Sequence, residues 1–94
     1  MTKAKLIDAL SNKTGLTKKE SQVVLEGFCE TVVEALTQGE SVEIRGFGSF
    51  RPQLRPARTA RNPSTGATIQ VPARRVPVFK ASKELKDRVK DSTP

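Results

Sequence analysis

Arginine side chains gather in one stretch of the sequence, residues 51–75, which contains no acidic residue and no lysine. The members of this stretch are Arg51, Arg55, Arg58, Arg61, Arg74 and Arg75. The guanidinium group is flat and permanently charged, and its forked donors suit phosphate oxygens and narrow, negatively charged minor grooves. This pattern predicts a segment that binds an anionic polymer.

The excess of positive charge lies in the same part of the sequence as the arginines. The whole chain carries +7, from 17 Lys+Arg and 10 Asp+Glu among 94 residues. Residues 51–80 contain seven basic side chains and no acidic one, while the two flanking segments nearly balance. A basic protein can bind nucleic acid, an anionic membrane or an acidic protein. Concentration of the excess on one segment favours a docking surface over a generally basic shell.

A turn interrupts the basic stretch at residues 61–66, where the sequence reads Arg-Asn-Pro-Ser-Thr-Gly. Asparagine, proline, serine and glycine are turn formers, and β-branched residues follow in the return limb. We therefore predict a β-ribbon arm that turns near residues 64–65. That turn sets Arg55 across from about Arg74, and facing like charges cost free energy unless an anion lies between them.

Pro63 has two interpretations. It is an ordinary turn residue, or it is an apolar wedge at an exposed tip that enters between base pairs and kinks a duplex. The whole basic segment also has a second interpretation, as a solvated and disordered loop. The lack of aromatic residues between 51 and 78 argues against a single-strand binder, which stacks bases on aromatic rings. We expect the four phenylalanines and Cys29 to lie in the core instead.

No enzyme class is indicated. The chain has no histidine and one cysteine, and it lacks a glycine-rich phosphate loop. We therefore expect no catalytic residue, no metal and no cofactor. The sequence also lacks an apolar run of about 20 residues and an apolar signal segment, so we expect no membrane partner. The single unpaired cysteine suits a reducing cytoplasm, where we expect the protein to be located.

The spacing of the apolar residues predicts the helices and strands that must position the arm. Helices are predicted over 3–13 and from the capping box Thr17-Lys18-Lys19-Glu20 to about residue 38. Residues 41–45 alternate as a strand, a second strand begins at 49–50 and continues into the arm, and Ser82 begins a last helix. About 70 residues outside the arm make a small core. We therefore expect a second subunit.

The residues in these elements resemble the bacterial HU and integration host factor family of DNA-bending proteins. The resemblance is carried by Gly46-Phe47-Gly48-Ser49-Phe50, by Arg61-Asn62-Pro63-Ser64-Thr65-Gly66, and by Val76-Pro77-Val78-Phe79 with Lys83. It spans essentially the whole chain. It implies an α+β fold and an intertwined dimer with a helical dimerisation base (1–40), a saddle of three antiparallel strands (41–80), an arm at about 52–76, and a C-terminal helix (82–90).

The resemblance also implies residue roles. Arg55, Arg58 and Arg61 would contact the groove and its phosphates, Asn62 would support the tip, Pro63 would intercalate, and Arg74 and Arg75 would add contacts. Lys3, Lys83 and Lys86 would hold flanking phosphates, although solvated helix ends explain these lysines equally well. The implied function is bending and compaction of double-stranded DNA in the bacterial nucleoid, with little sequence preference.

Two alternatives remain open. Val42-Glu43-Ile44-Arg45-Gly46 is more similar to the integration host factor beta subunit, in which matching positions help to select a site. Arg45 is therefore a candidate DNA contact, and the dimer could be a heterodimer with a paralogue. The alternative interpretation of Glu43 and Arg45 is an ordinary ion pair on the protein surface. The other alternative function is a basic module that binds RNA or acidic proteins.

Overall fold

A computed structural model describes residues 1–94, which divide into two compact units, residues 1–34 and 35–94. In chain order the elements are α1 (Lys3–Thr14), α2 (Lys18–Thr37), β1 (Val42–Ile44), β2 (Gly48–Arg55), β3 (Arg58–Arg61), β4 (Thr68–Val71), β5 (Arg74–Ala81) and α3 (Lys83–Lys90). The predicted α+β class is confirmed. None of the three helices combines the length and the apolar character that a membrane span requires.

The helices begin at capping side chains, and α1 ends at a glycine. Thr2 caps α1, and Gly15 ends it in the left-handed conformation at φ +80°. Before α2, the Thr17 hydroxyl accepts from the amide of Glu20 at 3.0 Å, and a Glu20 carboxylate oxygen accepts from the amide of Thr17 at 3.0 Å. The hydrogen bond from the Thr17 backbone amide to the carboxylate lowers the pKa of the Glu20 carboxyl. Ser82 caps α3 by accepting from the amide of Leu85 at 3.0 Å.

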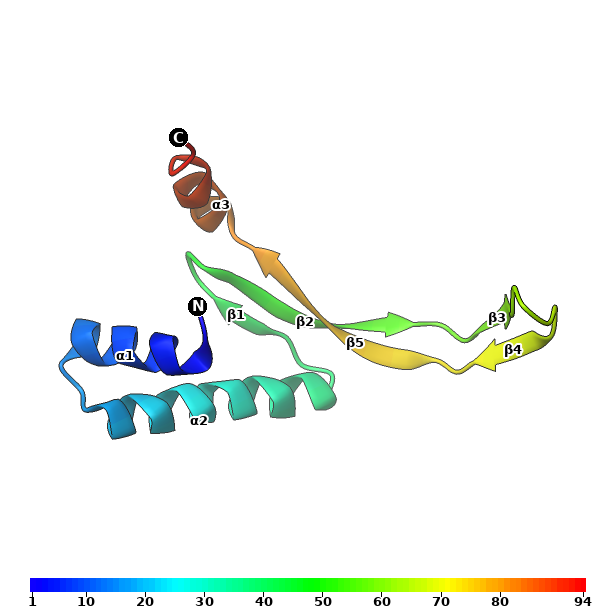
Figure 1. The fold of residues 1–94 in the computed structure, drawn as a ribbon, viewed down its shortest axis with the longest axis horizontal. Coiled ribbons are helices and arrows are strands. Elements are labelled where there is room, and N and C mark those ends of the chain that lie inside the picture. Colours follow the sequence, from blue (N-terminus) through cyan, green and yellow to red (C-terminus); the bar gives the residue numbers. More distant parts are fainter. The chain divides into compact units, whose positions relative to one another are not determined.

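The strands form one three-stranded antiparallel sheet, in the order β1-β2-β5, and one two-stranded ribbon, β3-β4. Strands β2 and β5 lie side by side and lead into β3 and β4 (Figure 1). Their register sets Phe50 opposite Phe79 and Arg55 opposite Arg74. The predicted facing of Arg55 and Arg74 is therefore confirmed.

The ladder is interrupted between the sheet and the outer ribbon. On one strand Pro56 and Ala57 are unpaired, and on the other Pro72 and Ala73 are unpaired. A proline cannot donate to a ladder, which explains a break at this level of both strands. Two residues are skipped on each side, so the pairing resumes in the same register with Arg58 opposite Val71.

The sheet has two chemically different faces. In an antiparallel ladder, directly opposed residues share a face and successive residues alternate. The apolar face carries Val42, Ile44, Phe50, Pro52, Leu54, Arg75, Pro77 and Phe79, and the cationic face carries Glu43, Ser49, Arg51, Gln53, Arg55, Arg74, Val76, Val78 and Lys80.

Few side chains are buried within one chain. Val32 is the one buried apolar residue, at 8% exposed. Phe79 packs against Phe50 and Phe47, with ring centroids 4.9 and 5.5 Å apart, yet Phe79 and Phe47 remain 42% and 43% exposed. Cys29 is exposed too. The prediction that these residues lie in a core is wrong for a single chain, because the expected apolar stripes have no cover within it.

Candidate nucleic-acid interface

The cationic face of the sheet brings together basic side chains from both ends of the basic segment. Arg51 and Arg55 come from β2, and Arg74 and Lys80 come from β5. All four residues are exposed. Strand pairing holds them in a row along the ribbon, because alternate residues of each strand point the same way. The row can bind a linear series of anionic groups.

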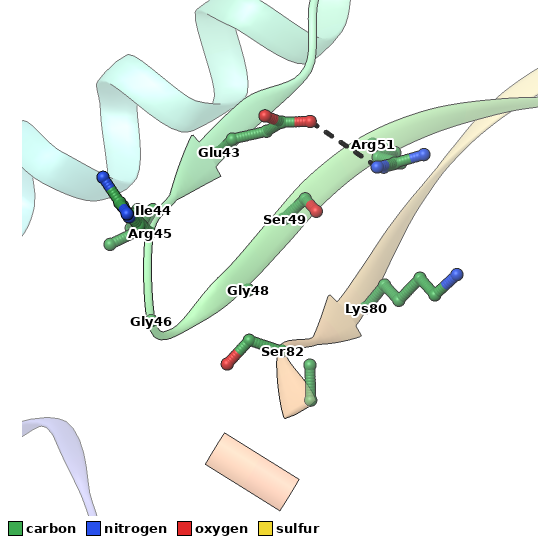
Figure 2. A pocket seen from close by; sticks show the side chains of 10 residues that line it. Glu43, Ile44, Arg45, Gly46, Gly48, Ser49, Arg51, Lys80 and Ser82 are labelled. Carbon is green, nitrogen blue, oxygen red and sulfur yellow. Dashed lines mark ion pairs between the residues drawn. The ribbon is translucent and has the colours of Figure 1, made fainter. Parts of the chain in front are cut away.

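One end of this face is hollowed. An open hollow of about 550 Å³ is lined by Arg45, Arg51 and Lys80 and by one carboxylate, that of Glu43. The Glu43 and Arg51 side chains point toward each other (Figure 2), with Arg51 Nη2 3.5 Å from Glu43 Oε1. Both side chains are more than half exposed, so the pair is weak in free energy. The hollow keeps an excess of two positive charges.

The outer ribbon presents arginine on both of its faces. Arg58 shares one face with Val71, and Ala60 and Ile69 continue that face. Arg61 is three residues farther along, opposite Thr68, and therefore projects from the other face. A ribbon that lay flat on a charged surface would need its arginines on one face. Cations on both faces suit a groove with a phosphate wall on each side.

Asn62 organises the tip. Its amide donates to the carbonyl of Ala67, its carbonyl accepts from the amide of Gly66, and its side-chain oxygen accepts from the amide of Ser64, all at 2.8 Å. Gly66 adopts a left-handed φ of +74°, which glycine tolerates best. The intervening Pro63 is exposed. The tip is thus a closed loop that presents a rigid apolar ring.

The remaining predicted contacts lie elsewhere. Arg75 is on the apolar face, where its Nη1 donates to the carbonyl of Thr37 at 2.8 Å. Lys3, in the first unit, donates to a Glu26 carboxylate oxygen at 2.7 Å, and this hydrogen bond lowers the pKa of the Glu26 carboxyl. Lys83 and Lys86 are exposed on α3.

Lys80 is a basic residue of the cationic face that is not among the contacts predicted from the sequence. It shares the cationic face with Arg74, from which it is separated by Val76 and Val78 on alternate positions of β5. Counting the strand alternation from Arg74 through an uninterrupted β5 would have placed Lys80 on this face. No cluster of three metal-ligating side chains occurs in the chain.

Comparison with known proteins connects this geometry to a family. Residues 1–90 match the family model described as bacterial DNA-binding protein. The chain is 49% identical over 89 residues to DNA-binding protein HU of Clostridium pasteurianum, covering 95% of this chain and 98% of that protein. It is 45% identical over 92 residues to integration host factor subunit alpha of Bordetella avium, covering 98% of this chain and 79% of that protein. Among solved structures, a cocrystal structure of Anabaena HU with DNA superposes with a TM-score of 0.87 at 41% identity, covering 100% of both chains.

Proposed function

Because the chain belongs to the bacterial HU and integration host factor family of DNA-binding proteins, we propose that it holds duplex DNA by the minor groove and bends it. It is an architectural protein and not an enzyme. In this proposal it works as a pair of identical chains on the nucleoid of a bacterial cytoplasm. Its contacts go mainly to the sugar-phosphate backbone, so sequence preference is small.

The observation that carries the proposal is the distribution of arginine on the outer ribbon. Arg58 and Arg61 project from opposite faces, while the cationic face continues toward the sheet through Arg55 and Arg74. A ribbon about one strand pair wide with charge on both sides fits between two phosphate walls. The minor groove offers such walls, about 6 Å apart in B-form DNA, and can widen when the duplex bends.

Pro63 supplies the bending step in this proposal. It lies between Asn62 and Ser64, which are hydrogen bonded to each other, so its ring is fixed at the tip. Inserting such a ring unstacks one base step at a cost of a few kcal/mol, and the bent duplex then offers phosphates to the rest of the cationic face.

We expect Pro63→Ala to lower the bend angle of an intact duplex while leaving binding to nicked or gapped DNA within about threefold of the unchanged protein. The reason is that predistorted DNA needs less unstacking. Fluorescence transfer between the duplex ends reports the bend, and gel shifts report the affinity.

The control for this substitution is Ser64→Ala, which alters the adjacent tip residue and keeps the proline. It should bend DNA as the unchanged protein does, because the Ser64 amide that bonds Asn62 is retained. Equal bending by Pro63→Ala and by the unchanged protein would remove the wedge from the proposal. Failure of the unchanged protein to bend any duplex would remove the proposal itself.

A second copy of the chain completes the fold in this proposal. The accessible surface is 7865 Å², about 2,500 Å² more than the roughly 5,350 Å² that a compact monomer of this mass exposes. Part of the excess belongs to the ribbon. The rest includes apolar side chains of α2, on which Val23, Val24, Phe28 and Val33 are 42–63% exposed. Apolar surface on this scale is usually covered by a partner.

Sedimentation equilibrium should therefore give twice the chain mass of 10.3 kDa at micromolar concentration. The unfolding midpoint should also rise with protein concentration, because association stabilises the folded state by mass action. A folded species of single-chain mass with a concentration-independent midpoint would contradict the dimer.

A further inference from the structure

Arg75 and Arg74 are neighbours in sequence but project from opposite faces of the ribbon. Arg74 is opposite Arg55 on the cationic face, whereas Arg75 is opposite Leu54 on the apolar face. The guanidinium of Arg75 therefore does not extend the row of basic side chains on the cationic face. It has a hydrogen-bond partner within the protein instead.

The partner is the end of a helix. Arg75 Nη1 donates to the carbonyl oxygen of Thr37 at 2.8 Å, and Thr37 is the last residue of α2. The last turn of α2 contains no basic residue of its own. The carbonyl end of a helix carries partial negative charge and is stabilised by a nearby cation. Arg75 supplies that cation from 38 positions away in the sequence.

The chain after the helix leaves room for the guanidinium. The amide of Gly39 donates to the carbonyl of Leu36, and the amides of Gln38 and Glu40 donate to that of Ala35. Gly39 itself has a left-handed φ of +80°. A Cβ at this position would lie 3.8, 3.9 and 4.0 Å from Arg75 Nη2, Cζ and Nη1. Because these three distances are nearly equal, the planar face of the guanidinium lies over the glycine.

The contact joins two elements that the strand ladder does not join. Arg75 lies one residue from the start of β5, at the level where β2 and β5 leave the sheet for the outer ribbon. Beyond that level the ladder is interrupted at Pro56-Ala57 and Pro72-Ala73. The Thr37 contact is thus a lateral attachment close to the root of the arm.

We propose that Arg75 is a positioning residue: it fastens the root of the arm to the C-terminal end of α2, fixes the direction in which the arm leaves the sheet, and makes no phosphate contact. This inference rests on the proposed function, since the direction of the arm determines how far the duplex is bent. It removes Arg75 from the set of DNA contacts that the sequence predicts.

The test compares Arg75→Ala with the matched control Arg74→Ala, which removes the same side chain from the opposite face. The logarithm of affinity for a duplex is measured against the logarithm of salt concentration. We expect the slope for Arg75→Ala to equal that of the unchanged protein. We expect Arg74→Ala to reduce the slope by about 1 for each phosphate that the arginine would have neutralised.

The bend of the fully bound duplex provides the second readout. With every DNA molecule occupied, a general loss of stability would not alter the bend, but a loosened arm root would. Arg75→Ala should broaden the distribution of bend angles and lower its mean, and Arg75→Lys should restore both, because a lysine ammonium can also donate to the Thr37 carbonyl.

A third readout needs no DNA. In free Arg75→Ala protein, the amides of Gln38, Gly39 and Glu40 should exchange with solvent faster than in the unchanged protein, while Arg74→Ala leaves them unaffected. A reduced salt slope in Arg75→Ala, an unaltered bend, or unaltered exchange would each overturn the inference. A failure of the unchanged protein to bend DNA would instead refute the proposed function. The amide exchange of free Arg75→Ala protein would still test the contact between Arg75 and the end of α2.

Discussion

Raising the salt concentration from about 50 to 200 mM should weaken the binding of duplex DNA by about 10³-fold or more, the loss expected when at least six phosphates are neutralised. Each chain offers six suitable cations on the sheet and the outer ribbon: Arg51, Arg55, Arg58, Arg61, Arg74 and Lys80. All six side chains are exposed, and Arg51 is the one among them that forms an ion pair, with Glu43 at 3.5 Å. Binding must therefore release counterions from DNA and not merely exchange one protein ion pair for another.

The measurement is a titration of one duplex at several salt concentrations, with the slope of log affinity against log salt as the result. The double substitution Arg55→Gln and Arg74→Gln removes one facing pair per chain and should lower the slope by up to about 2 for each engaged arm. A matched variant is Lys5→Gln in α1, which changes charge by one unit outside the interface and should leave the slope unchanged. A slope close to zero for the unchanged protein would contradict the electrostatic account altogether.

Replacing Gly48 by alanine should be the most damaging small substitution in the sheet. A Cβ at this position would lie 2.5 Å from the backbone carbonyl oxygen of Lys80 and 2.7 Å from Cζ of the Phe79 ring. The ring is also packed against Phe50, and the carbonyl belongs to β5, which is paired with β2. Neither neighbour can give way without shifting the ladder. Overpacking of this kind costs about 1–3 kcal/mol.

Chemical denaturation at fixed protein concentration measures that loss. The matched control is Gly27→Ala in α2, where a Cβ would meet nothing within 4 Å and the backbone φ is not left-handed. This control should raise the free energy of unfolding by about 0.5–1 kcal/mol, because alanine loses less backbone entropy than glycine in a helix. A Gly48→Ala protein as stable as the unchanged one would show that β2 and β5 separate more easily than their packing indicates.

Much of the fold follows from local signals in the sequence. Thr2, the Thr17–Glu20 capping box and Ser82 mark helix beginnings, and Gly15 marks an end, because each satisfies or permits backbone geometry over a few residues. The facing of Arg55 and Arg74 follows equally simply, since a turn centred at 64–65 fixes the residues that oppose each other.

The features that could not be predicted depend on contacts between residues far apart in the sequence. Strand alternation places Arg74 and Arg75 on opposite faces, but which of these faces meets the end of α2 depends on tertiary packing, and the bond from Arg75 to Thr37 spans 38 residues. The exposure of Phe47 and Phe79 depends on which distant elements of the chain cover them. Neither relation is encoded in a local period, so the apolar pattern alone identified candidates for burial without identifying what would cover them.

The interruption of the ladder also limits how the length of the arm can change during evolution. Pro56-Ala57 and Pro72-Ala73 skip equal numbers of residues, and this equality keeps Arg58 and Arg61 on their respective faces. Loss or gain of one residue on one strand would shift the pairing by one and turn every following side chain of that strand to the other face. Compensated changes on both strands would preserve the pairing. Drift in arm length is therefore expected to proceed by matched insertions or deletions, while substitutions within each skipped dipeptide are freer.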